Sequence, residues 1–164
     1  MTHDVLTFHP GRRINGTVPP AFQRQVSRAL ADAYNATLNP HPDIGPPTLY
    51  DAIAQAEARR WADEMEPLTQ PVSERTLREW LAPIPAVVRN EKTPEAIAAW
   101  LAGVIMAVGH LEAGAFNAAT QREALQTFKF FPSASDVYDV VSGPAVGIRQ
   151  RYAVLRRIAA GGAP

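Results

Sequence analysis

Helix-start signals recur along this chain, and they restrict it to a helical fold more strongly than any other feature. Thr93-Pro94-Glu95 combines a capping hydroxyl, a proline at the first helical position and an acid in the first turn. Ser73 and Asn117 stand at similar capping positions, and Ser133 is followed three residues later by Asp136, as in a capping box. These signals predict helices after each of the four caps.

Apolar residues recur at helical spacing between these signals, and no segment alternates apolar and polar residues for long enough to indicate a sheet. We therefore predict an all-α fold, a single compact multi-helix domain of about six helices. Beyond the helices that begin at Ser73 and Thr93, the expected helices cover about residues 20–37, 49–65 with Thr48 as the cap, 118–128, 133–143 and 144–160. The helix after Thr93 has few polar residues, so we expect it to be the most buried, with Trp100 in the core.

The proline and glycine positions divide the chain. Residues 1–17 are polar and interrupted by proline and glycine, which favours a flexible N-terminal arm. Residues 18–160 are expected to form the helical domain, with a proline-rich connection at 38–47 and a short tail at 161–164. Gly143-Pro144 is expected to end one helix, and the last helix should begin at Pro144.

Composition gives little sign of catalytic or metal chemistry. The chain has no cysteine, which excludes disulfides, thiolate nucleophiles and cysteine metal sites. Its four histidines do not have the spacing of a zinc site, and no phosphate-binding glycine pattern or nucleophile elbow occurs. No apolar stretch is long enough to span a bilayer, and no secretory signal is visible. The sequence predicts a cytoplasmic, non-catalytic protein with no metal and no cofactor.

Charge is distributed unevenly, although the formal net charge is zero. Residues 32–143 hold eight basic and fifteen acidic side chains, whereas residues 144–164 hold four arginines and no acid. Arginine forks pair well with phosphates, so the candidate nucleic-acid-binding residues are Arg149, Arg151, Arg156 and Arg157. In the alternative interpretation these arginines form ion pairs within the chain, with Asp63, Glu64 and Glu66 as the candidate partners.

Aromatic residues suggest a second surface. Trp61, Trp80 and Trp100 each lie on an apolar helical stripe, which is more typical of a core than of a base-stacking platform. Phe128, Phe130 and Phe131 fall within four residues, divided by Lys129 and followed by Pro132, so all three rings cannot face one core. These three phenylalanines are the candidate partner-binding residues. A loop folded across the core is the alternative.

The segment 93–141 resembles the phage lambda P-type replication proteins, which load the replicative helicase at a phage origin. The resemblance rests on a tryptophan-bearing helix with Trp100, a following alanine-rich helix, and the sequence Phe131-Pro132-Ser133-Ala134-Ser135-Asp136-Val137 entering another helix. It implies a non-catalytic adaptor of phage or prophage-like DNA replication that binds a replication protein. The C-terminal arginines add DNA as a possible second partner. The alternatives are a phage-encoded regulatory or inhibitory protein that binds a host enzyme, with the acidic middle as a nucleic-acid mimic, and small-molecule binding in an apolar pocket beside the tryptophan stripes.

Overall fold

The computed structural model describes residues 26–40, 42, 49–89 and 92–161, and within these the fold is all-α, as the sequence predicts. The predicted arm at 1–17, the start of the first predicted helix and most of the proline-rich connection lie outside the described residues. The helices are α1 (Arg28–Leu38), α2 (Ala52–Thr69), α3 (Glu74–Leu81), α4 (Ile84–Val87), α5 (Pro94–Val108), α6 (Ala118–Thr127) and α7 (Ala134–Ala159), with a 3₁₀ turn η3 (Ala113–Ala115).

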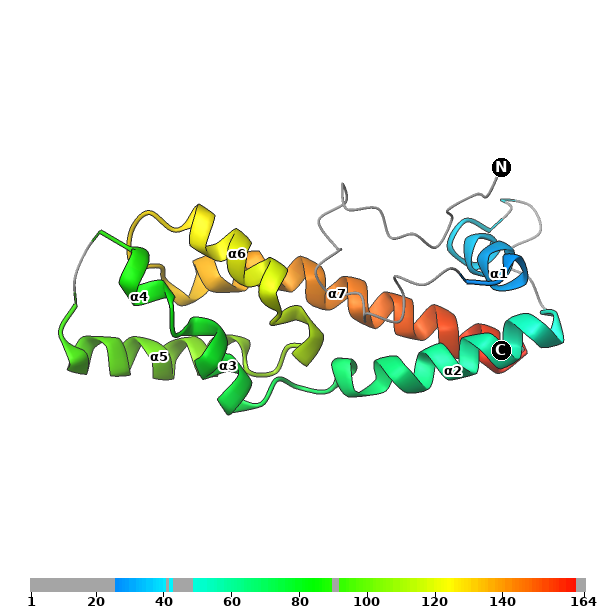
Figure 1. Cartoon of the computed structure of the whole chain (residues 1–164), viewed down its shortest axis with the longest axis horizontal. Coiled ribbons are helices and arrows are strands. Elements are labelled where there is room, and N and C mark those ends of the chain that lie inside the picture. The colour runs from blue at the N-terminus through cyan, green and yellow to red at the C-terminus, as the bar shows by residue number, and fades with distance from the viewer. Residues whose placement is uncertain (1–25, 41, 43–48, 90–91, 162–164) are drawn as a thin grey trace.

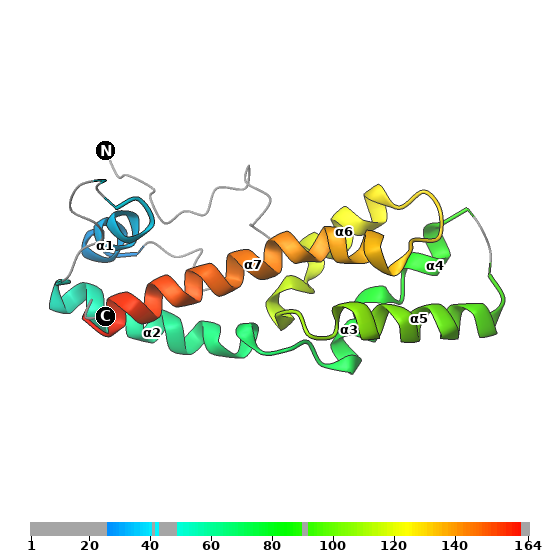
Figure 2. The same cartoon turned by 180° about the vertical axis from the view of Figure 1, so that it is seen from behind.

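Helix α7 is the long element on which the other helices pack (Figure 1). Its C-terminal half lies antiparallel to α2 and beneath α1, and its N-terminal half packs against α5 and α6 (Figures 1 and 2). Helix α3 packs in turn on α5 and α6, and α4 packs on α6. The two long helices share a heptad pattern, with buried positions separated alternately by four and three residues. In α7 these positions are Val137, Val141, Pro144, Ile148, Arg151, Leu155 and Ile158, and in α2 they are Ala54, Ala58, Trp61 and Met65.

The prediction that Gly143-Pro144 divides two helices is wrong, because α7 runs through both residues without interruption. An interior proline removes one helical hydrogen bond and costs about 3 kcal/mol. The buried positions continue beyond it, and Ile148, Leu155 and Ile158 are all 0% exposed. Burial of each such side chain contributes about 1.5–3 kcal/mol, so together they outweigh the local cost of the proline.

The predicted caps at Ser73, Thr93, Asn117 and Ser133 are all confirmed, since each side chain accepts a hydrogen bond from a backbone N–H in the first turn of its helix. The start of α2 differs from the prediction. Asp51 caps this helix, where Thr48 was expected to, and α2 extends to Thr69.

Helix α5 lies at the edge of the structure, which contradicts the prediction that it is the most buried helix. Only Val104 and Val108 are buried, while Trp100 is half-buried and Met106 is 84% exposed. The physical reason is the composition of the helix. Apart from Met106, its exposed apolar positions are Ala96, Ala98, Ala99, Ala102 and Gly103, which have little or no side-chain surface to lose from contact with water.

Tertiary hydrogen bonds hold the smaller helices against one another. The indole Nε1 of Trp80 lies 3.2 Å from both the Asn117 carbonyl oxygen and Thr120 Oγ1, which joins α3 to the start of α6. Its ring meets Phe116 edge to face, with 5.7 Å between centroids. Trp61 and Trp80 are therefore core residues, as predicted. The Trp80 contacts fix α3 against α6, and α6 is one wall of the candidate site.

Candidate partner-binding groove

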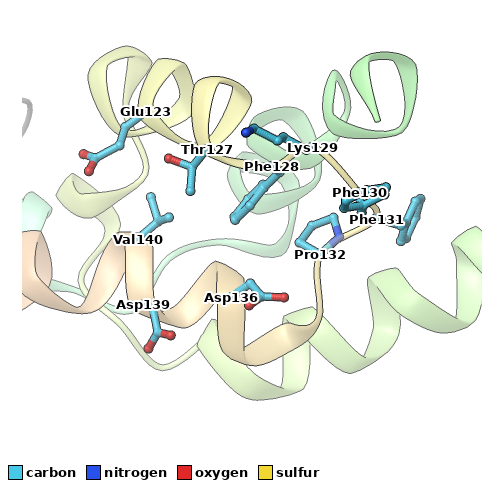
Figure 3. A pocket seen from close by; sticks show the side chains of 10 residues that line it. All are labelled: Glu123, Thr127, Phe128, Lys129, Phe130, Phe131, Pro132, Asp136, Asp139 and Val140. Atoms are coloured by element: carbon cyan, nitrogen blue, oxygen red, sulfur yellow. The ribbon is translucent and has the colours of Figure 1, made fainter. Parts of the chain in front are cut away.

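All three predicted phenylalanines line one hollow of about 610 Å³ at the junction between α6 and α7 (Figure 3). The connection from Phe128 to Ser133 forms one end, and α6 and α7 form the walls. The structure therefore brings the cluster together at a concave surface. Its full lining is Glu123, Thr127, Phe128, Lys129, Phe130, Phe131, Pro132, Asp136, Asp139 and Val140.

The three rings have different roles. Phe128 is 8% exposed and belongs to the core. Phe131 is half-buried and meets Trp100 edge to face, with 4.7 Å between ring centroids. Phe130 is 58% exposed. The expectation that the rings cannot all face one core is met, and Phe130 is the ring that remains largely in water.

The segment that carries Phe130 is held on both sides. The Arg89 backbone N–H donates to the Lys129 carbonyl oxygen at 3.2 Å, which fastens the segment to the residues that follow α4. On the other side, Trp100 Nε1 donates to the Pro132 carbonyl oxygen at 2.7 Å. Phe130 therefore projects from a fixed backbone, which lowers the entropy lost when a partner covers it.

A second hollow of about 640 Å³ adjoins the first and shares Glu123, Asp139 and Val140 with it. It extends along α7 as far as Gln150. Two more partly exposed apolar side chains line it, Tyr138 at 41% and Val146 at 45%. We refer to the two adjoining hollows together as the α6–α7 groove.

Acidic side chains outnumber basic ones on the groove lining. Glu123, Asp136 and Asp139 line it, and Lys129 is the basic residue among the lining positions of the two hollows. Hydrogen bonds from the Ser133 hydroxyl and backbone N–H lower the pKa of Asp136, so this carboxylate stays ionised at neutral pH. Sequence reasoning missed this acidic lining, although Asp136 and Asp139 are three residues apart and so share a helix face.

The four C-terminal arginines do not form one surface. Arg151 was predicted to contact nucleic acid, but it is 4% exposed and its Nε donates to the Gly147 carbonyl oxygen at 3.0 Å, so it is not available to a phosphate. Arg149 is held by Glu112, with 2.5 Å between Nε and Oε1. This hydrogen bond and the carboxylate charge raise the pKa of Arg149. Arg156 and Arg157 are exposed in the last turn of α7.

The predicted internal partners of these arginines lie elsewhere. Asp63, Glu64 and Glu66 are exposed on α2, and none of the ion pairs between described residues involves them. The acid that pairs with Arg149 is Glu112, a 6% exposed residue in the connection between α5 and η3. The alternative of pairing with the acids of α2 is therefore not found. The sequence gives no sign that Glu112 is buried, because its burial results from the meeting of two connections that are distant in the sequence, the one between α2 and α3 and the one between α5 and η3.

Glu112 is buried because two connections meet there. The Val72 N–H donates to the Leu111 carbonyl oxygen at 2.9 Å, and the Ala113 N–H donates to the Gln70 carbonyl oxygen at 2.8 Å. Together with the isolated bridge between Pro71 and Glu112, these bonds join the α2–α3 connection to the residues before η3. The Glu112–Arg149 pair then attaches this crossing to α7.

Among the described residues, no group of three or more histidine, aspartate or glutamate side chains is placed to hold a metal ion. None of the described helices is both long and apolar enough to cross a membrane. Comparison of the chain with protein-family models, curated proteins and solved structures finds no match.

Proposed function

We propose that this chain is a non-catalytic adaptor that binds a protein partner in the α6–α7 groove. The observation that carries the proposal is Phe130, a phenylalanine that is 58% exposed at a concave surface and held on an anchored backbone. Full burial of such a ring contributes about 1.5–3 kcal/mol, which is energy that a partner gains by covering it. Aromatic side chains in pockets are frequent anchors of protein interfaces.

The setting we propose is cytoplasmic replication of phage or prophage-like DNA, with a replicative helicase as the partner. This part rests on the resemblance to the phage lambda P-type replication proteins. Among the residues that carry the resemblance, Phe131, Pro132 and Asp136 line the groove. Trp100 lies outside the lining but contacts Phe131 and Pro132. The surplus of acidic residues along the groove also suits a second function, a phage-encoded inhibitor that presents carboxylates to a host enzyme in place of nucleic acid.

Replacement of the exposed ring tests the proposal. We expect Phe130→Ser to weaken binding to a purified replicative helicase by tenfold or more, because anchor residues contribute about 2 kcal/mol or more. The melting temperature should change little, since the ring is largely in water. Binding is measured by biolayer interferometry and stability by circular dichroism.

Met106→Ser is the matched control, because it removes a side chain that is 84% exposed on α5, outside the groove lining. This variant should bind as the wild type does. The helicase assignment is refuted if the wild type does not bind the helicase. The groove is refuted as the docking surface if Phe130→Ser and Met106→Ser bind equally well.

A further inference from the structure

The α6–α7 groove has a length that a short helix fits. Along α7 its lining runs from Asp136 to Gln150, a separation of fourteen residues. At a rise of 1.5 Å per residue this corresponds to about 21 Å, or roughly four helical turns. An extended peptide of about six residues would span the same length.

The walls of the groove favour a helical occupant over an extended one. Both walls are helices, whose backbone groups are paired within α6 and α7 except for the one hydrogen bond that Pro144 removes, so neither offers a sheet edge to which a strand could add. A docking helix pairs its backbone N–H and C=O groups internally, so it contacts the groove only through its side chains. Gly143 lines the groove, is exposed on α7 and has open space where a Cβ would be, so another helix can approach closely there.

The acidic side chains of the groove favour an occupant that carries positive charge. Glu123 and Asp139 line both hollows, and Asp136 lines the hollow that Phe130 also lines. Three carboxylates against one lysine give this surface a local negative charge, although the chain as a whole has a formal net charge of zero. A basic ligand therefore gains from the groove without being drawn to the rest of the molecule.

From these observations we propose that the groove receives an amphipathic helix of about four turns from the partner protein, with an apolar stripe flanked by lysine or arginine. The apolar stripe covers Phe130, Tyr138 and Val146, and the basic flanks face Glu123 and Asp139. This inference rests on the proposed function and specifies the part of the partner that docks. It does not depend on the partner being a helicase.

The test uses synthetic peptides with the full chain. The probe is a fluorescein-labelled 18-residue peptide. Its leucines are alternately three and four positions apart, so that they form one stripe along a helix, and lysines lie on both sides of that stripe. A second peptide replaces each lysine by glutamate, and a third has the first composition in a scrambled order that removes the apolar stripe. Fluorescence anisotropy at 50 mM salt measures the three affinities.

We expect the wild type to bind the lysine peptide about tenfold more tightly than the glutamate peptide, since each exposed pair contributes at most about a fivefold change in affinity. The scrambled peptide should bind at least tenfold more weakly. Glu123→Lys combined with Asp139→Lys should reverse the preference in favour of the glutamate peptide. Asp136 is left unchanged because its carboxylate completes the capping box of α7 with Ser133.

Asp63→Lys combined with Glu64→Lys is the matched control, because it makes the same change in net charge on the exposed surface of α2. This variant should keep the wild-type preference. The inference is overturned if the α2 variant reverses the preference equally, if both charged peptides bind the wild type alike, or if the scrambled peptide binds as well as the first. Failure of every peptide to bind, with helicase binding still dependent on Phe130, overturns the helical occupant and leaves the proposed function standing.

Discussion

The continuity of α7 can be tested at Gly143, because the predicted and observed structures require opposite effects of the same substitution. In the structure Gly143 lies inside α7, does not have a positive φ, and a Cβ added there would meet nothing within 4 Å. Gly143→Ala should therefore stabilise the protein by at most the difference in helix propensity, about 0.8–1.0 kcal/mol, because a Cβ directly before Pro144 crowds the proline ring and offsets part of that gain. For a domain of this size that corresponds to a rise in melting temperature of at most about 2–4 °C.

If a helix instead ended at Ser142 with Gly143 in a left-handed conformation, alanine would be strained, and the same substitution would destabilise by about 1 kcal/mol. Two other glycines calibrate the measurement. A Cβ at Gly103, inside α5, also meets nothing within 4 Å, so Gly103→Ala should stabilise by a similar amount. A Cβ at Gly114 would lie 2.8 Å from Ile148 Cδ1, so Gly114→Ala should cost about 1–3 kcal/mol.

Thermal unfolding followed by circular dichroism at 222 nm decides between the two structures. A rise for Gly143→Ala together with Gly103→Ala, and a fall for Gly114→Ala, is the expected result. A fall in melting temperature for Gly143→Ala, with Gly103→Ala still stabilising, would refute the continuous helix and restore the break that the Gly143-Pro144 sequence suggests.

Two further predictions concern charge. The folded-state pKa of Asp136 is lowered by Ser133, so the carboxylate stabilises the protein above the unfolded-state pKa of about 3.9, and this stabilisation is lost as pH falls through the lower folded value. Asp136→Asn should lower the melting temperature at pH 7 and have less effect at pH 2, which pH-dependent melts will show. The second prediction concerns Arg156 and Arg157, which are exposed. If these two residues bind duplex DNA, gel-shift assays should give a slope of log affinity against log salt concentration no steeper than about −1.8. Arg151→Ala should leave that slope unchanged and lower the stability of the protein, because Arg151 is buried.

Local signals in the sequence predicted the starts of α3, α5, α6 and α7, because a cap acts within a single turn of backbone. The capping box at Ser133 needs only Asp136, three residues away, to close two hydrogen bonds. Such interactions do not depend on the rest of the fold. The same local reasoning failed at Gly143-Pro144, where the heptad of buried positions on both sides of the proline outweighs its preference to end a helix.

Burial was harder to predict because it depends on which helices meet. Arg151 occupies a heptad position of α7 between Ile148 and Leu155, so the spacing of apolar residues did contain the signal that it faces inward. Helix α5 shows the opposite error. The hydropathy of α5 suggested a central position, yet an alanine-rich helix can lie at the edge of the fold. The 84% exposure of Met106 shows that α5 does so. The groove was beyond sequence reasoning, since Glu123 comes from a different helix than Asp139.

Gly143 also connects stability to recognition. Apart from the adjacent ring of Pro144, nothing in the fold favours a glycine there, because its φ is not positive and no atom beyond its chain neighbours and the nearby backbone of α7 lies within 4 Å of where a Cβ would be. The residue nevertheless costs the helix up to about 1 kcal/mol relative to alanine. Gly143 lines the α6–α7 groove, so the open space beside it is available to a docking helix, and a methyl group would fill part of that space. Gly143→Ala should therefore raise the melting temperature and weaken binding of the lysine peptide, whereas Gly103→Ala should raise the melting temperature and leave binding unchanged. Sites where a stabilising change reduces binding are expected where a fold serves a partner at the expense of its own stability.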